Sequence, residues 1–135
     1  MSEPHPVAAA HHVALTVTDL DRSEAWWRRL FDAEEVLRED ADGRRAVILR
    51  LLPSSFVVGL VEHRAGDGQR FDPRRTGLDH VALTVAERAD LDAWAQHLDR
   101  HGTAHSGVID IPVGAILNTA DPDGIAVALF WDAPR

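Results

Sequence analysis

His12-Val-Ala-Leu-Thr-Val17 returns unchanged as the six residues from His80 to Val85, and this repeat is the strongest indication of the fold. The offset of 68 residues, from 12 to 80, is close to half of the 135-residue chain. It also pairs Trp26 with Trp94, so a duplicated module is the simplest explanation. Two related halves that pack together tend to share a site, and each half here opens with a histidine.

Length and composition describe one domain of ordinary size. With 45% hydrophobic residues the chain has enough apolar side chains for a core, but each half would be marginal alone and should share a core or pair with another chain. The net charge of −8 and the lack of basic clusters argue against nucleic acid and anionic membranes as partners. The sequence has no cysteine and no signal-like start, so we expect a cytoplasmic protein without disulfides.

Hydrophobic periodicity predicts the order β-α-β-β-β in each half. The first helix should begin with a cap at Asp21 and end near Ala33, and the second should run from Asp90 to His101, closed by Gly102. Strands are expected at 11–17, 34–39, 45–51, 56–63, 80–85, 104–109, 113–119 and 125–131. The predicted organisation is a flexible lead-in (1–10), a first module (11–63), a linker (64–77) and a second module (78–135), which together form one domain.

The doubled βαβββ unit, the repeated hexapeptide and the turn Asp121-Pro122-Asp123-Gly124 before the last strand resemble the vicinal oxygen chelate superfamily. That group includes glyoxalase I, extradiol dioxygenases, fosfomycin resistance enzymes and bleomycin-binding resistance proteins. The resemblance implies an α+β fold in which two tandem βαβββ modules form a curled mixed sheet with a cleft, and it implies a homodimer. It also implies a metal in the cleft, with ligand positions at His12, near Gly59, at His80 and at Ala128.

Two of these four implied ligand positions carry no donor. The imidazoles of His12 and His80 suit Zn, Fe, Ni or Mn, but metal-binding members usually have a glutamate where this chain has Ala128. Catalytic metal sites take about three protein ligands, so we expect a degenerate site and favour no metal. Strand alternation places His63 on the face of Gly59 and Glu62 on the other face, which makes His63 the candidate base or third ligand.

Three further residues are candidates for substrate binding. Arg50 and its repeat partner Asn118 are polar positions in otherwise apolar strands, and Trp131 ends the strand that carries Ala128. The alternatives are a solvent-facing role for Arg50 and a core role for Trp131.

The favoured function is that of a glyoxalase-, bleomycin-resistance- or dioxygenase-like protein that binds a small organic molecule in the cleft of paired modules. One alternative is a metal-dependent lyase, isomerase or dioxygenase that uses His12 and His80 as ligands. Another is a metal-free, drug-sequestering protein, for which the net charge of −8 favours a cationic ligand. A third is a metal-free enzyme in which His12, His80 or His63 acts as general base. The sequence leaves open whether the cleft forms within one chain or between two.

Overall fold

The computed structural model describes residues 3–135 and contains two modules with the predicted order of elements. The first module consists of β1 (His12–Thr16), α1 (Leu20–Leu30), β2 (Ala33–Ala41), β3 (Arg44–Leu51) and β4 (Val57–His63). The second consists of β5 (His80–Thr84), α2 (Arg88–Arg100), β6 (His105–Ile111), β7 (Gly114–Ala120) and β8 (Ala126–Asp132). The α+β class with two tandem βαβββ modules is therefore confirmed. Residues 3–11 and 64–79 contain no helix or strand, and positions 1 and 2 of the predicted lead-in lie outside the described residues.

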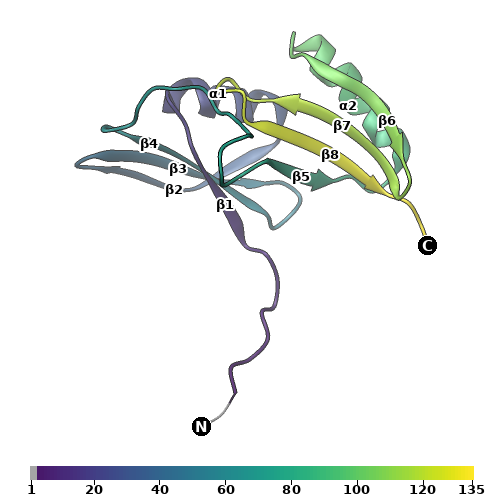
Figure 1. Ribbon diagram of the computed structural model, residues 1–135, viewed down its shortest axis with the longest axis horizontal. Helices are drawn as coiled ribbons and strands as arrows, with labels where there is room; N and C mark the ends of the chain where they lie inside the picture. Colours follow the sequence, from purple (N-terminus) through teal and green to yellow (C-terminus); the bar gives the residue numbers. More distant parts are fainter. Residues whose placement is uncertain (1–2) are drawn as a thin grey trace.

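The strands form two separate four-stranded mixed sheets, with the orders β1-β4-β3-β2 and β5-β8-β7-β6. The edge strands β1 and β5 run parallel to β4 and β8, and the other pairs are antiparallel. Figure 1 shows the two sheets side by side, with the N-terminal segment running away from the body of the molecule. The resemblance implied a curled mixed sheet built from both modules; in the structure each module has its own sheet, and β1 and β5 of the same chain are not hydrogen-bonded to each other.

The first helix differs from its predicted bounds at both ends. Its cap is Asp19 rather than Asp21, since the Asp19 carboxylate accepts the backbone N–H of Arg22 at 3.1 Å. The helix ends at Leu30 because Phe31 turns to an extended conformation, and Ala33 then pairs with Leu51 in β2. Ala33 was thus wrongly predicted as the helix end.

The second helix starts two residues before the predicted Asp90. Glu87 is the cap, and Asp90 is the third residue of a capping box in which its carboxylate accepts the Glu87 backbone N–H at 2.9 Å. The predicted C-terminal role of Gly102 is confirmed by its positive φ of 65°. All eight strands described lie within two residues of their predicted positions.

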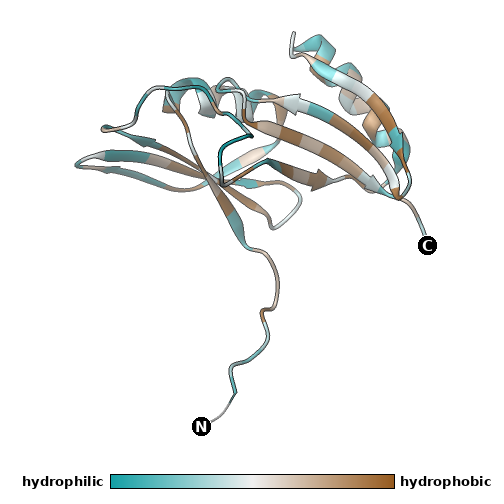
Figure 2. Ribbon diagram, in the orientation of Figure 1, coloured by the Kyte–Doolittle hydropathy of each residue, from teal (hydrophilic) through white to brown (hydrophobic). Residues whose placement is uncertain are grey.

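One contiguous core lies on the helix-covered faces of both sheets. Strand β3 contributes Val47 and Leu49, both fully buried, and Trp27 of α1 is also fully buried. Figure 2 shows apolar residues concentrated along β8 and polar residues at the tip of the β2–β3 hairpin. The modules meet where Phe31 packs on Trp94, with ring centroids 5.0 Å apart. Among residues 3–135, no helix is long and apolar enough to span a membrane.

The opposite face of each sheet has no helix over it and is called the open face below. On the edge strands its residues alternate with the core residues and are exposed to solvent: His12, Ala14 and Thr16 in β1, and His80, Ala82 and Thr84 in β5. Residues in register on neighbouring strands share a face, so the strand pairing defines which side chains accompany each histidine.

Candidate functional site

The open face of the first sheet brings His12 and Arg50 into one row. Both residues pair with Val57 of β4, His12 from one side and Arg50 from the other. Since neighbouring strands lie about 4.8 Å apart, the two Cα atoms are roughly 10 Å apart. Arg50 is half-buried and Val57 is buried, so a histidine and an arginine flank an apolar position.

The open face of the second sheet groups His80, Ala128 and Asn118. His80 pairs with Ala126, two residues before Ala128, and Asn118 pairs with Ala128 itself. In the first sheet the residue beside Gly59 is Ile48. The repeat offset of 68 residues equates Arg50 with Asn118. By strand register, however, Ile48 beside Gly59 takes the place that Asn118 has beside Ala128. The two open faces therefore present different polar groups.

Each of the two candidate ligand histidines is held by its preceding residue. The Nδ1 atoms of His11 and His12 lie 2.8 Å apart, so one imidazole donates a hydrogen bond to the other. The Nδ1 atom of His80 lies 2.7 Å from the Asp79 carboxylate. A carboxylate on one ring nitrogen fixes the tautomer and leaves the other nitrogen, Nε2 of His80, free to contact a ligand.

The donor set of one chain does not fit a catalytic metal centre. Within residues 3–135 no three His, Cys, Asp or Glu side chains are grouped so that they could hold a metal ion. His12 and His80 belong to separate sheets, and Ala128 and Gly59 offer no donor. A side chain at Gly59 would also meet Ile48, whose Cδ1 lies 3.2 Å from the position of an added Cβ.

His63 lies at the far end of β4 from His12. Six residues separate it from Val57, the partner of His12, which is roughly 20 Å along a strand. The imidazoles of His12 and His63 in one chain are therefore too far apart to share a metal ion, and the structure does not support His63 as the third ligand to His12 of the same chain. Glu62 is also unavailable, because its carboxylate accepts the Leu20 backbone N–H at 2.9 Å.

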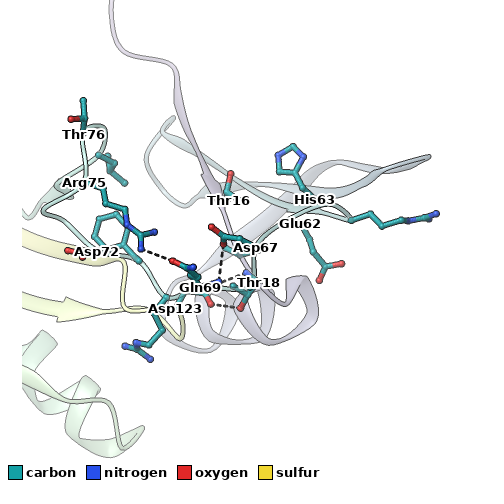
Figure 3. Close-up of a pocket in the computed structure, with 17 residues that line it drawn as sticks. Thr16, Thr18, Glu62, His63, Asp67, Gln69, Asp72, Arg75, Thr76 and Asp123 are labelled. Carbon is teal, nitrogen blue, oxygen red and sulfur yellow. Dashed lines mark hydrogen bonds between the residues drawn. The ribbon is translucent and has the colours of Figure 1, made fainter.

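His63 instead lines a polar groove of about 590 Å³ between the ends of β1 and β4 and the linker. Figure 3 shows side chains of the first sheet on one wall and linker side chains on the other. Across the linker, the Arg75 guanidinium donates to Gln69 at 2.6 Å. The composition of residues 64–77 predicts only a linker and gives no sign that these residues form one wall of a groove.

A second groove, also of about 590 Å³, lies between the modules, and none of the residues from 3 to 135 that line it is charged. It runs along the edge strand β5 and is lined by Ala10, Phe31, Leu51, Leu52, Pro53, Ser54, Phe56, Ala82, Leu83, Thr84, Val85, Trp94 and Leu129. We refer to it as the apolar groove.

Trp131 does not accompany the other candidate residues. It pairs with Ala115, a fully buried residue, and packs against the core on the helix-covered face. The structure therefore places Trp131 opposite to Asn118 and Ala128. Of the substrate-binding candidates, Arg50 and Asn118 lie on the open faces.

A buried aspartate of the Asp-Pro-Asp-Gly turn joins the modules. Asp123 is 4% exposed, and its carboxylate accepts the Thr18 backbone N–H at 3.0 Å, the Thr18 hydroxyl and the Arg22 guanidinium at 3.0 Å. We call these three residues the module junction. The sequence identified the turn, but it held no sign that the turn would receive donors from the first module.

Stability is expected to depend on the ionisation of Asp121 in the same turn. Burial raises the pKa of its carboxyl from 3.8 to about 6, although Oδ1 accepts the backbone N–H groups of Asp123 and Ile125. Oδ2 is buried and has no hydrogen-bond partner among residues 3–135. Because the folded state binds this proton more tightly than the unfolded chain, the group stabilises the fold most at acidic pH and loses that contribution as pH rises through about 6.

Urea unfolding of the wild type and of Asp121→Asn near pH 4.5 and near pH 7.5 checks this expectation. The advantage of the wild type over the variant should shrink by about 2 kcal/mol at the higher pH. A difference between the two proteins that does not change with pH would contradict the raised pKa of Asp121.

Comparisons with known proteins agree with the fold. The model of the Glyoxalase/Bleomycin resistance protein/Dioxygenase superfamily matches residues 9–129. The crystal structure of a glyoxylase/bleomycin resistance protein/dioxygenase domain from Frankia sp. EAN1pec is 33% identical with a TM-score of 0.88, over 95% of this chain and 100% of that one. Catechol-2,3-dioxygenase from Bacillus subtilis (strain 168) is 28% identical over 144 residues, which cover 100% of this chain and 45% of that enzyme. The chain thus spans less than half of this curated relative.

Two more distant structures share the fold at identities that show the fold alone. A mutant of the fosfomycin resistance protein FosX from Listeria monocytogenes, complexed with Mn(II) and a dihydroxypropylphosphonic acid, is 18% identical with a TM-score of 0.70, over 93% of both chains. The antibiotic binding protein TnmS3 from Streptomyces sp. CB03234 is 15% identical with a TM-score of 0.73, over 96% of this chain and 99% of that one. With the family model matched over most of its length, the chain belongs to the Glyoxalase/Bleomycin resistance protein/Dioxygenase superfamily.

Proposed function

We propose that this protein is a homodimer that binds a small organic molecule, without a catalytic metal, between the first module of one copy and the second module of the other. One observation carries the proposal: the polar residues of the two open faces lie on separate sheets, and on β1 and β5 these faces are exposed to solvent. A second copy related by twofold symmetry would bring His12 and Arg50 opposite His80 and Asn118.

The unpaired edges support the same arrangement. Within the described residues 3–135, strands β1 and β5 each have one backbone edge without a partner strand, and the apolar groove runs along β5. An exposed strand edge beside apolar surface is a ready template for pairing with another chain. In a twofold dimer, β1 of each copy would cover β5 of the other.

The absence of a carboxylate at position 128 favours binding over metal-dependent chemistry. The antibiotic binding protein TnmS3 shares the fold, which supports a sequestering role on this scaffold. We assign ligand contacts to His12, His80, Arg50 and Asn118, and to Trp131 a supporting role on the core face of β8. A cytoplasmic location stays a prediction.

Mixing two variants tests the two-chain cleft. His12→Ala and His80→Ala should each weaken the binding of the fluorescent probe anilinonaphthalene sulfonate by about tenfold, because each loses one side of the cleft. When the two variants are unfolded and refolded together, about half of the dimers should contain one chain of each variant, and each mixed dimer has one cleft with both histidines. The number of tight binding sites per chain should therefore recover to about one quarter of the wild-type value. Light scattering should report a dimer throughout. A monomer, or mixing that restores no sites, would contradict the proposal.

A metal-dependent enzyme is the second candidate, because a FosX complex holds Mn(II) on the same fold. Elemental analysis of protein purified without an affinity tag separates the two candidates. About one metal per cleft, lost in the double variant His12→Ala, His80→Ala, would favour the enzyme. Metal-free, folded protein that is unchanged by added Zn, Mn, Fe or Ni would favour the binding protein.

A further inference from the structure

The geometry points to an anionic ligand: an organic molecule with an apolar body and one carboxylate or phosphoryl group, whose oxyanion binds the Arg50 guanidinium. This inference rests on the proposed function, since it concerns the same cleft. The net charge of −8 favours a cationic ligand, whereas this inference gives an anionic one. The two differ because the contact between an oxyanion and one guanidinium depends on the local charge and not on the charge of the whole chain.

Arg50 is distinguished from the other arginines of its strand by the lack of a partner. Arg44 pairs with Glu39 at 3.5 Å and Arg45 with Glu62 at 3.4 Å. In the part of the chain from residue 3 to residue 135, no carboxylate lies within ion-pair distance of the Arg50 guanidinium. A half-buried charge without a partner gives up hydration without a compensating contact, so it is open to an incoming anion.

On its own face of the sheet, Arg50 has two apolar neighbours and one carboxylate. Its neighbour in β4 is the buried Val57, and Ile48 lies two residues away on the same face. In β2 the residue in register is Glu34, which is exposed and forms no ion pair with it. The Glu34 carboxylate competes with any bound anion for the guanidinium, so replacing it by a neutral residue should strengthen the binding of the anion.

The chemistry of arginine sets the class of ligand. The planar guanidinium presents parallel N–H donors that match the two oxygens of a carboxylate or of a phosphoryl group. The adjacent apolar positions and His12, on the other side of Val57, suit a flat apolar body rather than a small inorganic ion.

Four ligands with the same aromatic body test this assignment in the full-length protein. Calorimetric titration should show that naphthoate or naphthyl phosphate binds about tenfold more tightly than the neutral naphthamide, and that the cationic naphthamidine binds weakest. The comparison of naphthoate with naphthyl phosphate decides between a carboxylate and a phosphoryl ligand.

Three variants locate the oxyanion. Arg50→Gln should weaken the better anion at least about tenfold and leave naphthamide unchanged, whereas Glu34→Gln should strengthen it. Arg44→Gln is the matched control, because it removes the same charge from the same face of β3, about 20 Å away along the strand, and should change little. Binding of naphthamide as tight as that of the anions, tightest binding of naphthamidine, or no effect of Arg50→Gln would overturn the inference and leave the proposed cleft standing. Failure of all four ligands to bind would overturn both.

Discussion

Replacing Asp123 by alanine is expected to lower the free energy of unfolding by about 2–4 kcal/mol. The carboxylate receives three hydrogen bonds at the module junction, two from Thr18 and one from Arg22, and it is 4% exposed. Alanine leaves the Thr18 N–H and hydroxyl without their acceptor. Arg22 is half exposed and recovers water, which keeps the loss below that of a fully buried ion pair.

Urea unfolding at constant pH measures this loss, and a second aspartate of the second module provides the control. Asp110 also pairs with an arginine, Arg88, at 2.8 Å, but its side chain is 76% exposed. Asp110→Ala should therefore cost no more than about 0.5 kcal/mol. If Asp123→Ala cost as little as Asp110→Ala, the module junction would not stabilise the fold. Asp123→Asn keeps the shape and one acceptor oxygen, so its effect should lie between the two.

Replacing Ala128 by glutamate is expected to raise the affinity for Zn²⁺ by about 100-fold, equivalent to ~2.8 kcal/mol. Ala128 lies two residues beyond the partner of His80 on the open face, so a carboxylate there would join that imidazole as a second ligand from the same module. In the proposed dimer, His12 of the other copy would supply the third ligand, which is the number that catalytic zinc sites normally use.

Zn²⁺ titration against a competing chelator gives this affinity, and three comparisons make it specific. Thr84→Glu adds the same charge to the same face, four residues from His80 on β5, and should give no gain. His80→Ala in the Ala128→Glu background should remove the gain. His12→Ala in that background should reduce it only if the second copy completes the site. An Ala128→Glu variant whose affinity equals that of Thr84→Glu would contradict the grouping of residues on the second open face.

The sequence predicted the fold closely because its strongest signals are local. A repeated hexapeptide, alternating apolar residues in the strands and helical spacing of the tryptophans each act over a few residues, and these patterns placed every described strand within two positions. Helix ends were less accurate. Asp19 and Asp21 are equally good caps by residue type, and the structure uses Asp19. At this start of α1 the Glu62 carboxylate, 42 residues away in the sequence, also accepts the Leu20 N–H, a contact that no local pattern predicts.

The candidate site was predictable only in part. Strand alternation predicts that Glu62 and His63 lie on opposite faces of β4, and the hydrogen bond that the Glu62 carboxylate accepts from the Leu20 N–H agrees with it. Both residues nevertheless line the polar groove at the end of the strand. Strand alternation could not give the distance from His63 to His12, which depends on how β1 aligns with β4. Nor could the repeat show that Ile48 lies beside Gly59 while Asn118 lies beside Ala128, because the two modules differ in strand register.

Residue type and spacing were enough to predict the duplicated βαβββ module, the two histidines that open the halves and the missing carboxylate at Ala128. The folded structure was needed to show that the halves form separate sheets joined through Asp123, that Arg50 has no ionic partner among residues 3–135 and that Trp131 faces the core. The reason is physical: these properties depend on contacts between segments far apart in the chain, which local pattern does not encode.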